Sequence, residues 1–238
     1  LARYIWIDPN DTEIVYISTG IFDREAANSE LDVGGGGEGI LKSTDGGETW
    51  ASKNDGIGNL YVGSLFMHPD DPEILIAGAG NIQYHESSGV YVSLDGAESW
   101  TQTLAEPLIT SVEFATSNAN IAYAASPIAV FRSDDRGRTW SRVTGSEDSW
   151  GPPGIVAGFP IDLQVSPDDP DTLFANNYGG GNFLSTDGGR TWAVASTGYT
   201  GAQARDIAVH PTMPNSVIVA ARSGLFCSGD WGGEWVGL

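Results

Sequence analysis

The chain has 238 residues, a length that fits one all-β domain. Its 31 acidic and 11 basic residues give a net charge of −20, which argues against nucleic acids and anionic membrane surfaces as partners, because both need a basic footprint. The single cysteine, Cys227, excludes an internal disulfide, and no apolar run reaches the length of a membrane-spanning helix.

Two motifs then alternate five times along the chain. The first is a turn rich in Asp and Pro between two apolar runs. It occupies residues 7–16, 67–76, 165–174 and 209–218, and a copy without proline runs from 114 to 123. Because Pro fixes φ and Asp bonds its own backbone, each copy predicts a tight hairpin between two strands.

The second motif is an octet that begins with Ser, carries Asp at its third position and ends with Trp. It occurs at residues 43–50, 93–100, 133–140, 185–192 and 228–235. Asp can accept hydrogen bonds from the backbone of a turn, Gly permits a positive φ, and Trp supplies a ring to bury. Each octet therefore predicts a turn between two further strands.

Two hairpins in each repeat predict a four-stranded antiparallel sheet, with strands A to D in chain order. The proline turn joins A to B, and the octet joins C to D. The expected sheets cover approximately residues 1–58, 59–106, 107–155, 156–200 and 201–238 of a single domain. Sheets of this kind bury their faces against neighbours around an axis, which predicts an all-β fold, a β-propeller with five visible blades. A linear β-solenoid is the rival architecture.

The two ends of the chain bear on how such a ring would close. Residue 1 is Leu rather than Met, so a processed protein or an excised segment is expected. The fifth repeat ends almost at its octet, and no strand is left over to fasten the first blade to the last. We therefore expect part of a larger ring, with an open arc and a tight five-blade closure as alternatives.

The octets resemble the Asp-box (BNR) repeat, and together with the proline hairpins they cover nearly the whole chain. This superfamily includes sialidases, xyloglucan-specific glycoside hydrolases, sortilin-type receptors and photosystem assembly factors, and the chain looks most like its bacterial secreted or surface members. The sialidase sequence Phe/Tyr-Arg-Ile-Pro is absent, so typical sialidase activity is not expected. The resemblance implies structural roles for the Asp and Trp residues of the octets: Asp45, Asp95, Asp135, Asp187, Asp230, Trp50, Trp100, Trp140, Trp192 and Trp235.

Propellers bind ligands on the face formed by the B–C and D–A loops, because several loops meet there. The longest such loops are expected at residues 21–37, 80–88, 144–154 and 176–181. Their acids are candidates for catalysis: Asp23, Glu25, Glu86 and Asp148. Other side chains there are candidates for ligand contact: Tyr84, His85, Trp150, Asn177 and Tyr178. Rings stack on sugars and carboxylates bind hydroxyls, whereas ordinary solvation of loops explains the same residues without a ligand.

No cofactor is expected, because turn capping explains the Asp residues of the proline hairpins; Ca²⁺ held by loop residues 23–32 is the alternative. We expect an extracellular or cell-surface binding or structural module that recognises a polysaccharide or a protein through its loop face. The alternative is a glycoside hydrolase that uses a pair of the loop carboxylates. A third interpretation is an assembly component whose exposed sheet edges dock neighbours.

Overall fold

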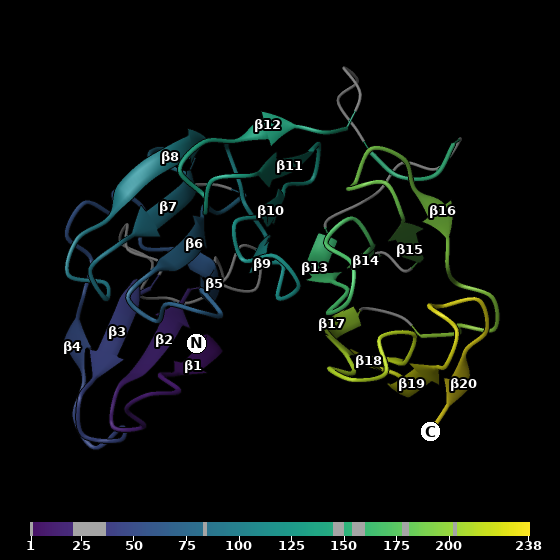
Figure 1. Ribbon diagram of the computed structural model, residues 1–238, viewed down its shortest axis with the longest axis horizontal. Coiled ribbons are helices and arrows are strands. Elements are labelled where there is room, and N and C mark those ends of the chain that lie inside the picture. Colours follow the sequence, from purple (N-terminus) through teal and green to yellow (C-terminus); the bar gives the residue numbers. More distant parts are fainter. Residues whose placement is uncertain are drawn as a thin grey trace. The chain divides into compact units, whose positions relative to one another are not determined.

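The computed structural model describes residues 2–20, 37–82, 85–144, 150–153, 160–177, 181–201 and 204–238, apart from the side chain of Ile161. Within these ranges the chain forms strands and turns and no helix. The described residues therefore contain no helix that could span a membrane. The strands make five antiparallel four-stranded sheets, and in each sheet the strands pair in chain order (Figure 1). The predicted all-β fold of five propeller blades is confirmed.

The chain forms two compact units, Leu1–Val112 with Gly137–Thr139, and Glu113–Arg136 with Trp140–Leu238. The first unit contains blades 1 and 2. Blade 1 comprises β1 (Ala2–Ile7), β2 (Val15–Thr19), β3 (Ile40–Ser43) and β4 (Ala51–Ser52). Blade 2 comprises β5 (Val62–Met67), β6 (Leu75–Ala79), β7 (Gly89–Ser93) and β8 (Thr101–Ala105).

The second unit contains blades 4 and 5 and most of blade 3, whose first strand includes the boundary between the units. Blade 3 comprises β9 (Ser111–Phe114), β10 (Ala122–Ala125), β11 (Val130–Ser133) and β12 (Ser141–Arg142). Blade 4 comprises β13 (Pro160–Val165), β14 (Leu173–Asn177), β15 (Asn182–Ser185) and β16 (Ala193–Val194). Blade 5 comprises β17 (Ala204–Val209), β18 (Val217–Ala221), β19 (Gly224–Ser228) and β20 (Val236–Gly237).

The two motifs lie where the sequence predicts them. The proline turn joins the first strand of a blade to the second, and the octet joins the third to the fourth. The residue before proline caps its turn: the Asp8 carboxylate accepts from the N–H of Asn10 at 2.8 Å, and His68 Nδ1 accepts from the N–H of Asp70 at 3.2 Å. His210 Nδ1 accepts from the N–H of Thr212 at the same distance of 3.2 Å. Different side chains thus perform one local function, which is to satisfy backbone donors in the turn.

Apolar side chains fill the space between consecutive blades within each unit. In the first unit, Tyr16 and Ile40 of blade 1 share a buried cluster with Leu65 and Tyr91 of blade 2. In the second unit, one cluster joins blades 3 and 4, and another joins blades 4 and 5. A four-stranded sheet has two apolar faces, so it needs a covering layer on each side. Within each unit, consecutive blades supply that layer to each other at the faces that meet.

Candidate functional site

The Asp-box octets are closed hydrogen-bonded turns. In blade 1, Asp45 Oδ1 accepts from the Ser43 hydroxyl at 2.7 Å and from the N–H of Thr49 at 2.8 Å, and Asp45 Oδ2 accepts from the Thr49 hydroxyl at 2.5 Å. Asp187 of blade 4 repeats this set with Ser185 and Thr191. These bonds occupy both carboxylate oxygens within the turn. The octet carboxylates therefore accept hydrogen bonds from their own turn and have few lone pairs left to bind a substrate.

The hydrogen bonds also set the charge state of these acids. The Thr49 hydroxyl and then the Thr49 N–H lower the pKa of Asp45 to about 2, because both donors favour the carboxylate. Partial burial alone would raise the pKa of Asp187, but the bonds from Thr191 outweigh burial and hold that pKa below its ordinary value. An acid that stays ionised through the neutral range is unsuited to donate a proton.

The tryptophans that end the octets differ in their surroundings. Trp100 and Trp235 are buried and donate their indole N–H to main-chain oxygens of the preceding blade, at Lys53 and Ala195, over 2.9 and 2.8 Å. Trp192 is also buried, but it donates to its own octet at Gly189. Trp140 is half-buried, and Trp50 is exposed. The expectation that the octet Trp buries its ring thus fails in blade 1.

Several predicted site residues lie outside the described part of the chain. They are Asp23, Glu25, Tyr84, Asp148 and Tyr178. Four others are placed: His85, Glu86, Trp150 and Asn177. Of these, the structure brings only His85 and Glu86 to an exposed position on the loop edge of a blade.

The turn that carries His85 and Glu86 is held from both sides. Asn59 Nδ2, in the D–A connection before blade 2, donates to the main-chain oxygen of Glu86 at 3.0 Å. His85 Nδ1 lies 3.1 Å from the main-chain oxygen of Pro107, in the D–A connection after the blade. Gln102 Nε2 donates to the oxygen of Ser88 at 2.8 Å and fixes the base of the turn. The B–C loop and the two D–A connections of this unit therefore meet on one edge, with both side chains facing solvent.

Trp150 and Asn177 correct the predicted set of ligand contacts. The Trp150 ring is buried, lies 4.9 Å from the Trp192 ring, and donates its N–H to the oxygen of Ser126 at 2.9 Å. An enclosed ring has no free face on which a sugar could stack, so Trp150 belongs to the core between blades 3 and 4. Asn177 is buried in β14. The sequence places Trp150 and Asn177 in or beside predicted loops, but loop position alone does not show whether a side chain is buried or exposed.

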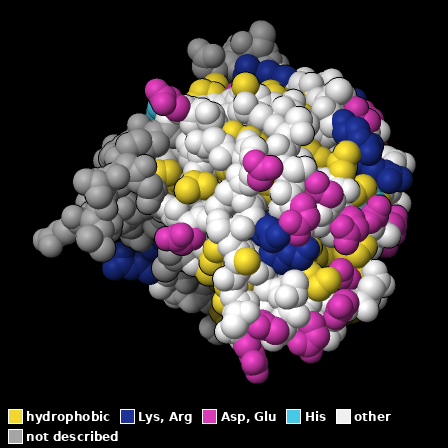
Figure 2. All heavy atoms as spheres, turned by 90° about the vertical axis from the view of Figure 1, so that its left-hand side faces the viewer, with side chains coloured by type: hydrophobic (Ala, Val, Ile, Leu, Met, Phe, Trp, Pro, Cys, Tyr) yellow, Lys and Arg dark blue, Asp and Glu magenta, His cyan; other side chains and the backbone are white. Residues whose placement is uncertain are grey.

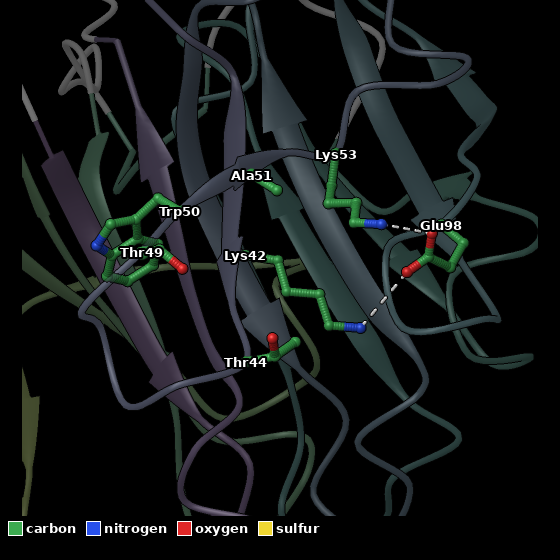
Figure 3. A pocket seen from close by; sticks show the side chains of 7 residues that line it. All are labelled: Lys42, Thr44, Thr49, Trp50, Ala51, Lys53 and Glu98. Atoms are coloured by element: carbon green, nitrogen blue, oxygen red, sulfur yellow. Dashed lines mark hydrogen bonds and ion pairs between the residues drawn. The ribbon is translucent and has the colours of Figure 1, made fainter.

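A second surface feature is a hollow of about 280 Å³ on the outer edge of blade 1, lined by Lys42, Thr44, Thr49, Trp50, Ala51, Lys53 and Glu98. It contains the only two lysines of the chain. Figure 3 shows both side chains pointing to Glu98 of the second octet, while the Trp50 ring points the other way. The ion pairs measure 2.5 Å for Lys53 and 3.7 Å for Lys42. On this side of the molecule, acidic side chains lie on several sides of the basic group near the centre of the view (Figure 2).

The two lysines of this hollow bond to the neighbouring blade, so their charges are already engaged within the protein. Lys42 Nζ donates to the main-chain oxygen of Gly96 at 2.9 Å. The pKa of Glu98 is lowered, mainly because Lys53 donates a hydrogen bond to its carboxylate. An equivalent hollow in blade 2 replaces the lysines with Val92 and Thr103. We interpret the charged version as a clamp between blades 1 and 2. Sequence analysis did not find it, although two isolated lysines flanking one octet are a visible signal.

A buried acid was also missed by sequence analysis. Glu113 of β9 accepts from the N–H of Val165 at 2.9 Å. Burial first, and the nearby Asp162 second, raise the pKa of Glu113 well above its ordinary value. Both carboxyl groups are buried, so neither reaches a bound polymer. Among the described residues, no group of three His, Cys, Asp or Glu side chains is arranged to hold a metal ion.

Comparison with known proteins supports the repeat and the fold. A sequence profile described as the BNR/Asp-box repeat matches residues 131–142. A search of curated protein sequences finds no match. The GH74 enzyme of Niastella koreensis is 20% identical over 99% of this chain and 38% of its own, with a TM-score of 0.66.

Two further solved structures share the fold. The GH74 xyloglucanase of Xanthomonas campestris is 16% identical over 95% of this chain and 36% of its own, with a TM-score of 0.66. An auxiliary nutrient binding protein of Bacteroides thetaiotaomicron is 11% identical over 99% of this chain and 56% of its own, with a TM-score of 0.64. The chain thus spans little more than a third of either GH74 structure. The chain carries a match to the BNR/Asp-box repeat at residues 131–142 and has the β-propeller fold.

Proposed function

We propose that this chain is a non-catalytic binding module, secreted or held at the cell surface, that recognises a polysaccharide through the B–C and D–A loop face. The observation that carries the proposal is the turn of blade 2 that bears His85 and Glu86. The main-chain oxygen of Glu86 accepts from Asn59 on one side of the turn, and the His85 ring bonds to the main-chain oxygen of Pro107 on the other, while both side chains are exposed. A pre-ordered polar surface lowers the entropy lost on binding.

The chemistry of this turn suits sugar hydroxyl groups. The Glu86 carboxylate accepts hydrogen bonds, and Nε2 of His85, whose Nδ1 donates to the oxygen of Pro107, accepts one. Asn59 Nδ2 donates to Glu86 O and, at 3.1 Å, to the Ser88 hydroxyl, so the turn resists collapse when the side chains engage a ligand. The net charge of −20 disfavours polyanions and favours neutral polysaccharides as ligands.

Binding is favoured over catalysis because of where the described acids lie. A glycoside hydrolase needs two carboxyl groups about 5–10 Å apart that face one cleft, one of them protonated. The octet acids are held in turns, and Glu113, whose pKa is raised by burial, lies buried between blades. The alternative remains a glycoside hydrolase that pairs two of Asp23, Glu25, Glu86 and Asp148. The fold shared with a xyloglucanase makes xyloglucan the first substrate to test.

Affinity electrophoresis in gels that contain xyloglucan, arabinoxylan or cellulose derivatives tests the proposal. We expect one of these polymers to retard the native chain. Glu86→Gln and His85→Ala should each weaken the affinity for that polymer roughly tenfold, because each removes about one well-formed hydrogen bond to a charged or polar group. Glu48→Gln is the matched control, because Glu48 is an exposed acid in an octet at the opposite edge of blade 1. Retardation that is equal in all four proteins would remove the loop face as the site.

A further inference from the structure

The turn at residues 85–88 contains a backbone conformation that the repeat does not explain. Among the described residues other than glycine, four have a positive φ. Three of them, Ala97, Arg136 and Trp231, lie in Asp-box octets, whose turns recur in every blade. The fourth is Ser87, with a φ of 53°. A positive φ is unfavourable for a residue with a Cβ, so the surroundings of Ser87 hold it in this conformation.

The side chains of the turn do not supply this restraint. The N–H of Ser88 closes the turn by donating to the main-chain oxygen of His85 at 3.3 Å, which makes Ser87 the third residue of the turn. Glycine is the usual residue at that position when φ is positive. His85, Glu86 and Ser87 are all exposed, so packing of their side chains in the core does not fix the backbone. The restraint comes from groups beneath the turn.

Three consecutive main-chain oxygens of the turn accept hydrogen bonds from side chains outside it. The oxygens of residues 86–88 accept, in chain order, from Asn59 Nδ2 at 3.0 Å, the Tyr91 hydroxyl at 2.5 Å and Gln102 Nε2 at 2.8 Å. Of these three donors, Tyr91 is the one that bonds to the residue with the positive φ. Tyr91 is therefore the donor best placed to hold Ser87 in its unfavourable conformation.

The Tyr91 hydroxyl connects the turn to the core of the first unit. The Tyr91 side chain is 2% exposed, and its ring belongs to the apolar cluster between blades 1 and 2. The hydroxyl also accepts from the N–H of Gly58 at 3.4 Å, in the D–A connection before blade 2. Burial raises the pKa of Tyr91, so the phenol keeps its proton through the neutral range and can donate to Ser87. One oxygen atom thus links the B–C turn, the D–A connection and the core.

Comparison of the five blades separates this hydroxyl from the needs of the fold. Tyr91 lies two residues before the Ser that begins its octet, and the other blades have apolar side chains at that position: Leu41, Phe131, Phe183 and Phe226. The three phenylalanines are buried, as Tyr91 is. An aromatic ring at this position is therefore an ordinary core residue of the blade. The hydroxyl occurs only in blade 2, where it reaches the turn.

Gly58 brings the D–A connection close enough to complete the contact. A methyl group at Gly58 would place its carbon 2.5 Å from Cβ of Ser87 and 2.7 Å from the Ser87 hydroxyl oxygen. Only a residue without a side chain permits this approach. The next residue, Asn59, donates to the oxygen of Glu86. The D–A connection and the B–C turn therefore fit each other at two consecutive residues.

We propose that the Tyr91 hydroxyl is a positioning group for the loop face, because it fixes the turn in the conformation that presents His85 and Glu86 to a ligand. Without this bond, Ser87 returns to the favoured negative φ, and the preceding Glu86 side chain changes direction. A turn that is ordered before binding loses less entropy when the ligand binds. The role in recognition rests on the polysaccharide binding proposed above, whereas the effect on the turn needs no ligand.

Tyr91→Phe and Tyr16→Phe form a matched pair of variants in the full chain. Both phenols are buried and donate to a main-chain oxygen, but Tyr16 bonds to Gly96 in an octet, at the opposite edge of the blades, over 3.2 Å. We expect Tyr91→Phe to speed hydrogen–deuterium exchange at residues 85–88 and at Gly58 about fivefold or more. Tyr91→Phe should also lower the affinity for the retarding polymer about fivefold. Tyr16→Phe should leave both quantities unchanged, although it removes the same kind of bond.

Gly58→Ala is a second, independent variant, because its methyl group displaces Ser87 without altering the phenol. It should speed exchange in the turn and weaken binding as Tyr91→Phe does, and it replaces that variant if Tyr91→Phe does not fold. Exchange in the turn that is unchanged in these variants overturns the proposal, and so does an unchanged affinity where Glu86→Gln lowers it. If none of these variants changes polymer affinity, polysaccharide binding at this face is wrong, and the exchange data alone decide whether Tyr91 fixes the turn.

Discussion

The N–H of Gly46 donates to the main-chain oxygen of Glu13 at 2.9 Å, which ties the octet of blade 1 to its proline turn. The bond recurs in every blade at 2.8–3.0 Å, from Gly96 to Glu73, Arg136 to Asn120, Gly188 to Asp171 and Trp231 to Asn215. Its donor has a positive φ in all five blades, including the non-glycine residues Arg136 and Trp231. The two motifs of the repeat thus form one hydrogen-bonded edge, and the loops at the other edge are left to vary.

Removal of an octet carboxylate should destabilise the fold. Asp187→Ala removes the acceptor for the Ser185 hydroxyl and for both donors of Thr191. The turn is partly solvated, so we expect a loss of about 1 kcal/mol in the free energy of unfolding rather than the full sum of three bonds. Urea unfolding followed by tryptophan fluorescence measures the loss. Asp168→Ala, at an exposed acid of the proline turn of the same blade, should change stability little.

The octet acids should make the chain sensitive to strong acid. The pKa of Asp45 is about 2 in the folded chain, below the value of about 4 expected when unfolded. The unfolded state therefore binds a proton first as pH falls. The contribution of Asp45 is complete above about pH 4 and is lost as pH falls towards 2. Thermal unfolding from pH 6 to pH 2 should show a shallower decline for Asp45→Asn than for the native chain; parallel curves would contradict the assignment.

Glu113 should have the opposite effect on stability. Burial and Asp162 raise its pKa, so the folded chain keeps the proton after the unfolded chain has lost it. Stability from this group is complete below the unfolded pKa of about 4.3 and falls by about 1.4 kcal/mol per pH unit between the two pKa values. Glu113→Gln keeps an acceptor for the N–H of Val165 and removes the titration. We expect the variant to gain stability relative to the native chain as pH rises from 4 to 7, in urea titrations at each pH.

Trp150 and Trp50 should respond differently to truncation. Trp150→Ala empties a buried site against Trp192 and should cost about 3–5 kcal/mol. Trp50→Ala removes an exposed ring of the same size and should cost about 1 kcal/mol or less. Chemical denaturation of both variants provides the comparison. Equal losses would mean that Trp150 is not the core residue that its burial indicates.

The sequence predicted the blades because their signals are local. Pro and Asp shape the proline turn locally, and in the octet Ser43 and Asp45 bond to Gly47 and Thr49, each four positions later. The position of Trp150 and the partners of Lys42 depend instead on which side chains face one another across two blades. No spacing within a single repeat encodes that relationship. The sequence alone therefore predicts the Trp150 ring on the loop face, and it does not predict the ion pairs of Lys42 and Lys53 with Glu98.

The most direct test of non-catalytic binding is to incubate the native chain with xyloglucan and to measure both bound protein and newly formed reducing ends. We expect the protein to be retained on the polysaccharide, Glu86→Gln to reduce this retention, and no reducing ends to form. Release of reducing ends that disappears in Asp23→Asn, Glu25→Gln or Asp148→Asn would contradict this expectation and identify the chain as a glycoside hydrolase.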